Sequence, residues 1–253
     1  MVTPLRKACA FGLLALLLTR QAPAWGASSV TIWPVNPLLG RDVEASALWL
    51  ENNDHKPVLL QIRVFRWTQD QGEDHYDDQT DIIASPPMSS VQPGTRQLIR
   101  LMRTGDKHAD VETAYRVLID EIPTPDAQQD TTRSASRIAI QLRYSIPLFV
   151  YGTRAADDAA NPALSSDMKT KPILLAHLDH RNGRARLMIR NDGSIHARLS
   201  KVTLGHTSIS AGLLGYILPG QEMAWPLPAG VSTGPLQALI NDSRMIETIP
   251  LRL

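Results

Sequence analysis

Apolar and polar side chains alternate with unusual regularity over positions 137–152, RIAIQLRYSIPLFVYG. The apolar positions of one parity are Ile138, Ile140, Leu142, Tyr144, Ile146 and Leu148. A period of two places alternate side chains on opposite faces of a β-strand. Twelve residues, 138–149, would span about 40 Å, roughly twice the length of a typical strand. The pattern therefore predicts an overlong strand with one apolar face and a proline, Pro147, near its end.

Shorter alternating segments fill the chain before this stretch, and no long helical period is present. They are SVTIWPVNPLL, EASALWLENN, PVLLQIRVFRWTQ, IIASPPMSSVQPGTRQLIRLMR and TAYRVLIDEIP. Each ends at a cluster of proline, glycine, asparagine or aspartate, the residues that favour turns. Short strands at this spacing are typical of an antiparallel β-sandwich.

The composition changes after Gly152. Residues 153–168, TRAADDAANPALSSDM, are mostly small or polar and indicate a linker. Short strands then resume, with a hairpin signal at Asn182-Gly183. We predict an all-β fold of two tandem β-sandwich domains, residues 27–152 and 169–253, joined by the linker 153–168.

The N-terminal segment has the layout of a secretory signal peptide. Arg6 and Lys7 precede an apolar run over residues 8–18, and Ala22 and Ala24 follow it. This run is shorter than the about 20 residues of a membrane span, although a signal anchor is the alternative interpretation. We expect residues 1–26 to be removed after Ala24 or Gly26 and the remaining chain to be exported.

Charge and cysteine content narrow the class of partner. Residues 1–26 contain the only cysteine, Cys9, three of the 26 basic residues and no acidic residue. The remaining chain carries 23 basic against 25 acidic residues, a net charge of −2. This balance argues against nucleic acid or an anionic membrane surface as the partner. No later segment approaches spanning length, so we expect no stable membrane insertion, and the fold must rely on its core rather than on disulfides.

The histidines and carboxylates form no convincing catalytic or metal-binding pattern. His177 and His180 lie three residues apart at a strand end, where they would face opposite sides, and His196 follows further on. The acidic stretch EDHYDDQTD lacks the glycine and spacing of a calcium loop. Neither a nucleophile elbow nor a cysteine–histidine pair is present in the exported part. Paired carboxylates remain open, but Glu121 beside Asp120 on one strand favours a salt bridge. We expect no enzymatic activity, metal or cofactor.

Arg100, Arg116 and Arg143 are arginines placed within predicted strands that could serve a binding cleft. Arg143 occupies the less apolar face of the long strand, where an unpaired buried guanidinium would be costly. It is either a solvent-facing strand residue or a cleft residue that binds a carboxylate through two parallel hydrogen bonds. Any one of the three is a candidate for such a cleft.

Several of these segments, taken in order, resemble the PapD-like periplasmic chaperones of pilus and fimbria assembly. They are IWPVNP, LWLENN, QIRVFRW, SPPMSSVQPGTRQLIRLMR, YRVLIDEIP, QLRYSIPLFVYG and INDS. IWPVNP and RYSIPLF look most like the archaic branch, the Csu-like chaperones of spore-coat and biofilm pili. The resemblance covers nearly all of the exported part and implies two immunoglobulin-like domains in an L-shaped arrangement in the periplasm.

Donor-strand complementation is the function that this resemblance implies. The chaperone lends a strand to an incomplete pilin subunit and then yields the subunit to an outer-membrane usher. The residues implied to fill the subunit's pockets are Ile138, Ile140, Leu142, Tyr144 and Ile146. Each aliphatic side chain that becomes buried contributes about 1.5–3 kcal/mol.

The chain departs from the family pattern at the carboxylate anchor. Better-known members hold the subunit's C-terminal carboxylate with an arginine in the first strand and a lysine at the end of the donor strand. The first strand here, TIWPVNP, has no arginine, and Pro147 stands at the lysine position. Arg143, Arg100 and Arg116 are the candidates for a replacement.

The family's inter-domain salt bridge is matched only in part. Glu121 and Asp242 stand at its acidic positions, whereas Tyr151 stands at the arginine position. Arg154 is the candidate substitute for that arginine.

Two other classes of exported protein are alternatives to the chaperone. An exported carbohydrate-binding or adhesive sandwich, such as a pilus subunit, would show one incomplete domain and an alternating N-terminal extension. A secreted hydrolase is the second alternative, but the sequence contains no group of residues that supports catalysis. An exposed apolar edge promotes aggregation, so a self-capping dimer is one expectation. The other expectation is that Pro34, Pro37 or Pro147 prevents a further strand from pairing with the edge.

Overall fold

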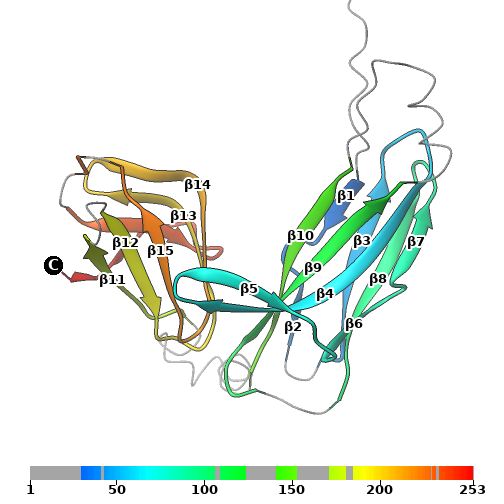
Figure 1. The fold of residues 1–253 in the computed structure, drawn as a ribbon, viewed down its shortest axis with the longest axis horizontal. Helices are drawn as coiled ribbons and strands as arrows, with labels where there is room; N and C mark the ends of the chain where they lie inside the picture. Colours follow the sequence, from blue (N-terminus) through cyan, green and yellow to red (C-terminus); the bar gives the residue numbers. More distant parts are fainter. Residues whose placement is uncertain are drawn as a thin grey trace, which may run out of the picture.

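The computed structural model describes residues 30–40, 43–105, 109–123, 141–152, 171–180, 185–228, 230–231 and 234–252. These residues form β-strands and turns without a helix, arranged as two lobes that diverge from a shared base (Figure 1). Within this described part there is consequently no helix able to cross a membrane. The predicted signal peptide, the linker 153–168 and positions 138 and 140 lie outside it.

The first lobe is a sandwich of two sheets. One sheet has the order β1-β3-β8-β6, with β1 (Val30–Trp33), β3 (Ala45–Asn52), β8 (Arg96–Arg103) and β6 (Ile82–Ser85). The other has the order β2-β10-β9-β4-β5, with β2 (Leu38–Leu39), β10 (Arg143–Val150), β9 (Thr113–Ile122), β4 (Val58–Asp70) and β5 (Glu73–Asp77). In addition, β7 (Met88–Val91) pairs with β4. Aliphatic side chains from both sheets bury one continuous core between them.

The second lobe repeats the two-sheet plan. One sheet has the order β15-β12-β11-β18, with β15 (Glu222–Pro226), β12 (Arg186–Asn191), β11 (Leu174–Asp179) and β18 (Leu251–Arg252). The other has the order β14-β13-β16-β17, with β14 (Thr207–Ile217), β13 (Ala197–Leu204), β16 (Leu236–Ile240) and β17 (Glu247–Ile249). A separate core fills the space between these sheets. The predicted all-β fold of two sandwiches is confirmed.

A fully buried asparagine ends one strand in each sandwich. Asn52 closes β3 and donates from its amide to the carbonyls of Lys56 and Val91, at 2.8 and 2.9 Å. Asn191 closes β12 and donates to the carbonyls of Ile195 and Ile217. A buried amide is stable only when its hydrogen-bonding groups are satisfied, so these bonds fix the turn that follows each strand.

Of the predicted overlong strand, the structure describes β10, Arg143–Val150, an eight-residue strand of ordinary length. Gln141 and Leu142 precede it outside the strand, and positions 138–140 lie outside the described residues, so the predicted length stays a prediction. The inward face of β10 follows the predicted alternation, because Ile146, Leu148 and Val150 enter the core of the first sandwich. Pro147 and Phe149 on the opposite face are buried as well. The alternation of buried and exposed positions therefore stops at Ser145, and something other than solvent covers the outer face beyond it.

The second sandwich covers that outer face. Phe149 packs with Trp67, Ala114 and Leu218 in an apolar cluster between the lobes. The ring of His196 stacks on Phe149, with ring centroids 3.5 Å apart and planes 4° apart. These contacts join the end of β10 to the second domain.

Two polar contacts reinforce this junction. Glu112, whose side chain is 0 % exposed, accepts hydrogen bonds from the backbone N–H of His196 at 2.9 Å and from its ring Nδ1 at 2.8 Å. The Gln69 amide donates to the carbonyl of Tyr216 and accepts from the N–H of Leu218, at 3.0 and 2.8 Å. The hairpin of β4 and β5 also reaches the second lobe, where Gly72 bridges to Met223 (Figure 1).

Gly152 is required where the chain leaves β10. An alanine Cβ at this position would overlap the backbone of Val111 and Asp110, which cannot move aside as a flexible side chain can. We expect Gly152→Ala to lower the free energy of unfolding by about 1–3 kcal/mol in urea denaturation. Gly212→Ala is the control, because a Cβ there meets nothing within 4 Å, and its effect should stay within about 0.5 kcal/mol. Equal effects of the two substitutions would contradict this assignment.

Glu112 should hold the two lobes together. Glu112→Ala removes a buried acceptor of charge-assisted bonds, so we expect a loss of about 1.5–3 kcal/mol in urea unfolding and a larger radius of gyration by small-angle scattering. Glu73→Ala, at an exposed position of β5, is the matched control and should change neither quantity. An unchanged radius of gyration in the Glu112 variant would show that other contacts set the arrangement of the lobes.

Candidate functional site

One edge of β10 has no strand beside it over most of its length in the described part of the chain. β9 pairs with β10 from Arg143 to Val150 on one side. On the other side β2 pairs only with Phe149 and Val150. The backbone from Arg143 to Leu148 therefore has an open edge, which is a template for another strand.

The residues predicted to bind a subunit differ in how deeply they are buried along this strand. Leu142 is half-buried and lies just before β10, and its carbonyl accepts a hydrogen bond from the N–H of Glu121. Tyr144 is half-buried against the core, and its hydroxyl accepts a hydrogen bond from the N–H of Val30 at 3.4 Å.

Ile146 is only 7 % exposed and belongs to the protein's own core. The prediction that Ile146 faces a partner does not fit this burial, because core packing already occupies its side chain. Ile138 and Ile140 lie outside the described residues.

The outer face of the same sheet carries two groups of charge. Near the start of β10, Asp120 hydrogen-bonds to Arg143 Nε and lies 2.7 Å from Arg63 Nη2. Burial of the Asp120 carboxyl would raise its pKa, but the hydrogen bonds and charges of Arg143 and Arg63 outweigh burial and keep that pKa below its usual range. The ionised carboxylate neutralises one of the two guanidinium groups. Arg143 is thus a paired residue with a 63 % exposed side chain.

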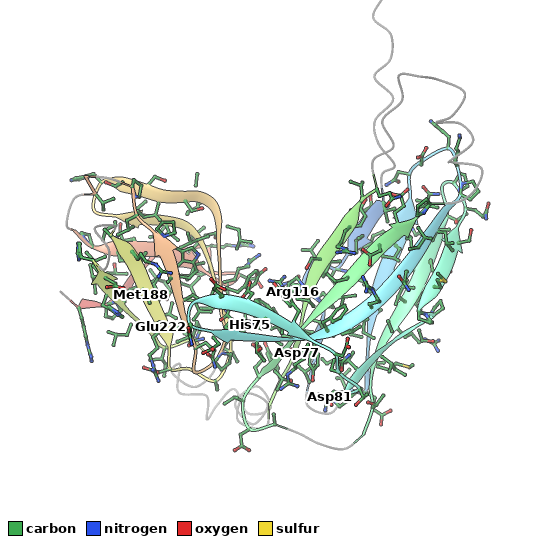
Figure 2. The ribbon with its side chains drawn as sticks, in the orientation of Figure 1. His75, Asp77, Asp81, Arg116, Met188 and Glu222 are labelled. Atoms are coloured by element: carbon green, nitrogen blue, oxygen red, sulfur yellow. The ribbon has the colours of Figure 1, made fainter. Side chains whose placement is uncertain are left out.

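Arg116 lies deeper, in the cleft between the lobes (Figure 2). Its guanidinium lies 3.8 Å from the ring centroid of Trp67 and 5.5 Å from that of Tyr216, so aromatic faces from both domains surround the charge. Its Nε is buried and makes no hydrogen bond within the described structure, although the side chain also interacts with Tyr76. No described carboxylate forms an ion pair with it.

A cavity of about 430 Å³ opens in front of Arg116. Its lining comes from both domains and comprises Val35, Asp74, Arg116, Ser145, Pro147, Leu213, Leu214, Gly215, Tyr216, Met223 and Trp225. Asp74, the only acidic residue of this lining, accepts hydrogen bonds from Trp67 and Gln69, each at 2.9 Å. The cavity therefore combines apolar walls with the guanidinium of Arg116, which has no ion pair with a described carboxylate.

Cross-strand register explains how Arg116 relates to the departure at Pro147. Arg116 on β9 stands directly opposite Pro147 on β10. The neighbouring strand thus places a cation on the same face, opposite the β10 position where the resemblance leads one to expect a lysine. Arg100 lies on β8, in the other sheet of the sandwich, and its exposed side chain is remote from this face.

The residues predicted for the inter-domain salt bridge are arranged differently. Asp242 pairs with Arg198 of its own domain at 2.8 Å. Glu121 Oε2 is buried without a hydrogen-bond partner among the described residues. Arg154 lies outside the described residues. Among the described residues, the carboxylate of Glu112 bonds across the domain boundary to His196, and no pattern in the sequence singles Glu112 out.

The histidines considered as metal ligands do not converge. His177 Nδ1 lies 3.8 Å from Glu222, whereas His196 serves the domain junction. Over the described ranges, no group of three histidine, cysteine or acidic side chains is placed to hold a metal ion. The site is therefore an open strand edge beside a basic cleft.

Comparisons with known proteins bear on this arrangement. The model of the PapD N-terminal domain, described as a pili and flagellar-assembly chaperone, matches residues 31–153. Chaperone protein MyfB of Yersinia enterocolitica is 25 % identical over 215 residues, which cover 79 % of this chain and 74 % of MyfB. YcbF of Escherichia coli K12, an uncharacterized fimbrial chaperone, is 24 % identical over 134 residues, 52 % of this chain and 55 % of YcbF.

Solved structures give the same result over a larger share of the chain. The similar chain in the CsuC–CsuE chaperone–tip adhesion subunit complex, from the archaic Csu pili of Acinetobacter baumannii, has a TM-score of 0.74 and 26 % identity. The match covers 89 % of this chain and 100 % of that one. The Escherichia coli chaperone DraB has a TM-score of 0.60 at 20 % identity, covering 90 % of this chain and 99 % of DraB, and supports the fold. Two immunoglobulin-like domains, the open edge of β10 and these relatives agree, and the chain belongs to the family of PapD-like pilus-assembly chaperones.

Proposed function

We propose that this protein captures pilin subunits in the periplasm by adding a subunit strand to the open edge of β10. The observation that carries the proposal is that edge: from Arg143 to Leu148 no strand of the described residues pairs with it, while the other side of β10 is fixed to β9. Strand addition gains affinity from backbone hydrogen bonds and specificity from alternate side chains. CsuC–CsuE is a chaperone–subunit complex, and its likeness to this chain supports both the mode of binding and the archaic branch.

Side chains just before β10 complete the proposed binding strand. In the sequence, Ile138, Ile140 and Leu142 continue the alternation of apolar positions that includes Tyr144 and Ile146. Ile146 holds the strand to its own core, so the residues offered to the subunit are those before it. The captured subunit is then passed to an outer-membrane usher. Chaperones of this family are periplasmic, and cleavage after Ala24 or Gly26 would release this one there.

Arg116 is the proposed anchor for the subunit's C-terminal carboxylate. A guanidinium binds a carboxylate through charge-assisted hydrogen bonds, and Arg116 lines the cavity without an ion pair to any described carboxylate. A strand added to β10 reaches this residue where Pro147 faces it. Arg143 already shares Asp120 with Arg63, and Arg100 lies on the other sheet, so neither is equally suited.

The first test concerns the apolar row. Ile140→Asp would place a charge in an apolar subunit pocket, and we expect at least a tenfold loss of a pilin subunit that is co-expressed and co-purified from the periplasm. Ile83→Asp is the matched control, because Ile83 is 45 % exposed on the other sheet, and it should leave recovery unchanged. Equal recovery with both variants would contradict the proposed binding strand.

The second test concerns the anchor. The probe is a ten-residue peptide of alternating valine and threonine, with two added N-terminal lysines and either a free or an amidated C-terminus. Arg116→Ala should weaken binding of the free-carboxylate peptide about 10- to 100-fold, since a hydrogen bond to a charged group contributes about 1.5–3 kcal/mol. It should also abolish the preference for the carboxylate over the amide. Arg100→Ala is the control, and an effect of that variant equal to the effect of Arg116→Ala would overturn the assignment.

A further inference from the structure

We infer that Pro147 limits the hydrogen bonds that a partner strand makes with β10 and ends that pairing beside Arg116. The inference rests on the proposed function and concerns one backbone group. It follows from the direction in which each residue of β10 turns its N–H and C=O.

The direction is fixed by hydrogen bonds on both sides of the strand. The Leu142 carbonyl accepts from the N–H of Glu121 at 3.1 Å, and Leu142 directly precedes the Arg143–Asp120 pair of the ladder. In an antiparallel pair, alternate residues turn both backbone groups toward the same neighbour. Residues 142, 144, 146 and 148 therefore bond to β9, and residues 143, 145, 147 and 149 face the open edge.

Contacts with β2 support this assignment independently. The N–H of Phe149 donates to the carbonyl of Pro37 at 3.3 Å, and the N–H of Tyr151 donates to that of Leu39 at 2.9 Å. Both are odd-numbered residues of β10 or its continuation, and both bond on the side away from β9. The parity assigned from Leu142 thus holds to the end of the strand.

The open edge consequently offers few donors. Proline has no N–H, and the N–H of Phe149 is already bonded to Pro37. Between Arg143 and Phe149, the N–H groups that face this edge without a bond to another described residue are therefore those of Arg143 and Ser145. At an even-numbered position, a proline would have removed a bond to β9. At position 147 it leaves the chaperone's own sheet intact, as expected of a proline on an edge strand.

The missing donor lies beside the proposed anchor. Pro147 faces Arg116. The last residues of a partner strand would therefore be held by their C-terminal carboxylate on Arg116 rather than by a hydrogen bond from a backbone N–H of β10. The Pro147 carbonyl still accepts a bond from the partner. Pro147 thereby weakens the complex by one hydrogen bond relative to an uninterrupted edge, which suits a protein that must release its cargo.

Two substitutions restore the donor, and a third removes another. Pro147→Ala and Pro147→Val both supply an N–H, and valine also keeps apolar bulk in the cavity wall. Each should tighten binding of the free-carboxylate valine–threonine peptide about 2- to 10-fold, chiefly through slower dissociation. Ser145→Pro removes an outward N–H and should weaken binding by a similar factor while preserving the bonds to β9.

Thermal unfolding checks the parity on which these expectations depend. Ile146→Ala removes only the core side chain, whereas Ile146→Pro also removes a bond to β9, so the proline variant should lower the melting temperature clearly more than the alanine variant does. Equal losses of stability in these two variants would overturn the assigned directions and with them the inference.

The binding results separate the inference from the proposed function. Tighter binding by both Pro147 variants, together with weaker binding by Ser145→Pro, supports the inference. Unchanged or weaker binding by either Pro147 variant overturns it, and the proposed function stands if Ser145→Pro and Arg116→Ala still weaken binding. A wild-type chain that binds neither the peptide nor a co-expressed pilin subunit overturns both.

Discussion

The strand β10 is bonded to β9 on one side and open on the other, and the rest of the molecule is organised around that asymmetry. An open edge is ordinarily a route to aggregation. Here the strand is held by its inward side chains, because Ile146, Leu148 and Val150 are buried in the core of the first sandwich. The edge can therefore be rigid and unpaired at once, which is the condition for a preformed template that another chain can join.

The second sandwich gives this edge a defined end. It packs on Phe149 through His196 and the apolar cluster around Trp67, and the buried Glu112 carboxylate ties it to the first sandwich. The cleft created by this junction holds Arg116 between aromatic rings of both domains. Domain packing thus converts an ordinary strand arginine into a cation placed where an added strand would terminate. The contacts that stabilise the junction also shape the cleft.

Much of the fold follows from the sequence, because apolar and polar side chains alternate along a strand that has one face in the core and one in solvent. That signal weakens where both faces are covered. Pro147 and Phe149 face the second domain, and Ile146 faces its own core, so alternation identifies the face of each residue but not what covers it. For this reason alternation places Ile146 in one row with Ile138, Ile140 and Leu142, although its side chain is buried in the core of its own domain.

The polar residues of the site were harder to assign for a related reason. Arg116 was among three candidate arginines, but choosing it required the cross-strand register with Pro147 and the position of the second domain. Glu112 and His196 are 84 residues apart and belong to different domains, so no local pattern links them. Long-range packing decides such pairs, and a single sequence carries no trace of it.

Amide hydrogen exchange along β10, with and without a bound pilin subunit, tests the central claim most directly. The account predicts that the N–H groups of Arg143 and Ser145 exchange rapidly in the free chaperone and become protected in the complex. The N–H of Ile146, bonded to β9, should be protected in both states. Protection of Arg143 and Ser145 that does not change when the subunit binds would contradict strand addition at this edge.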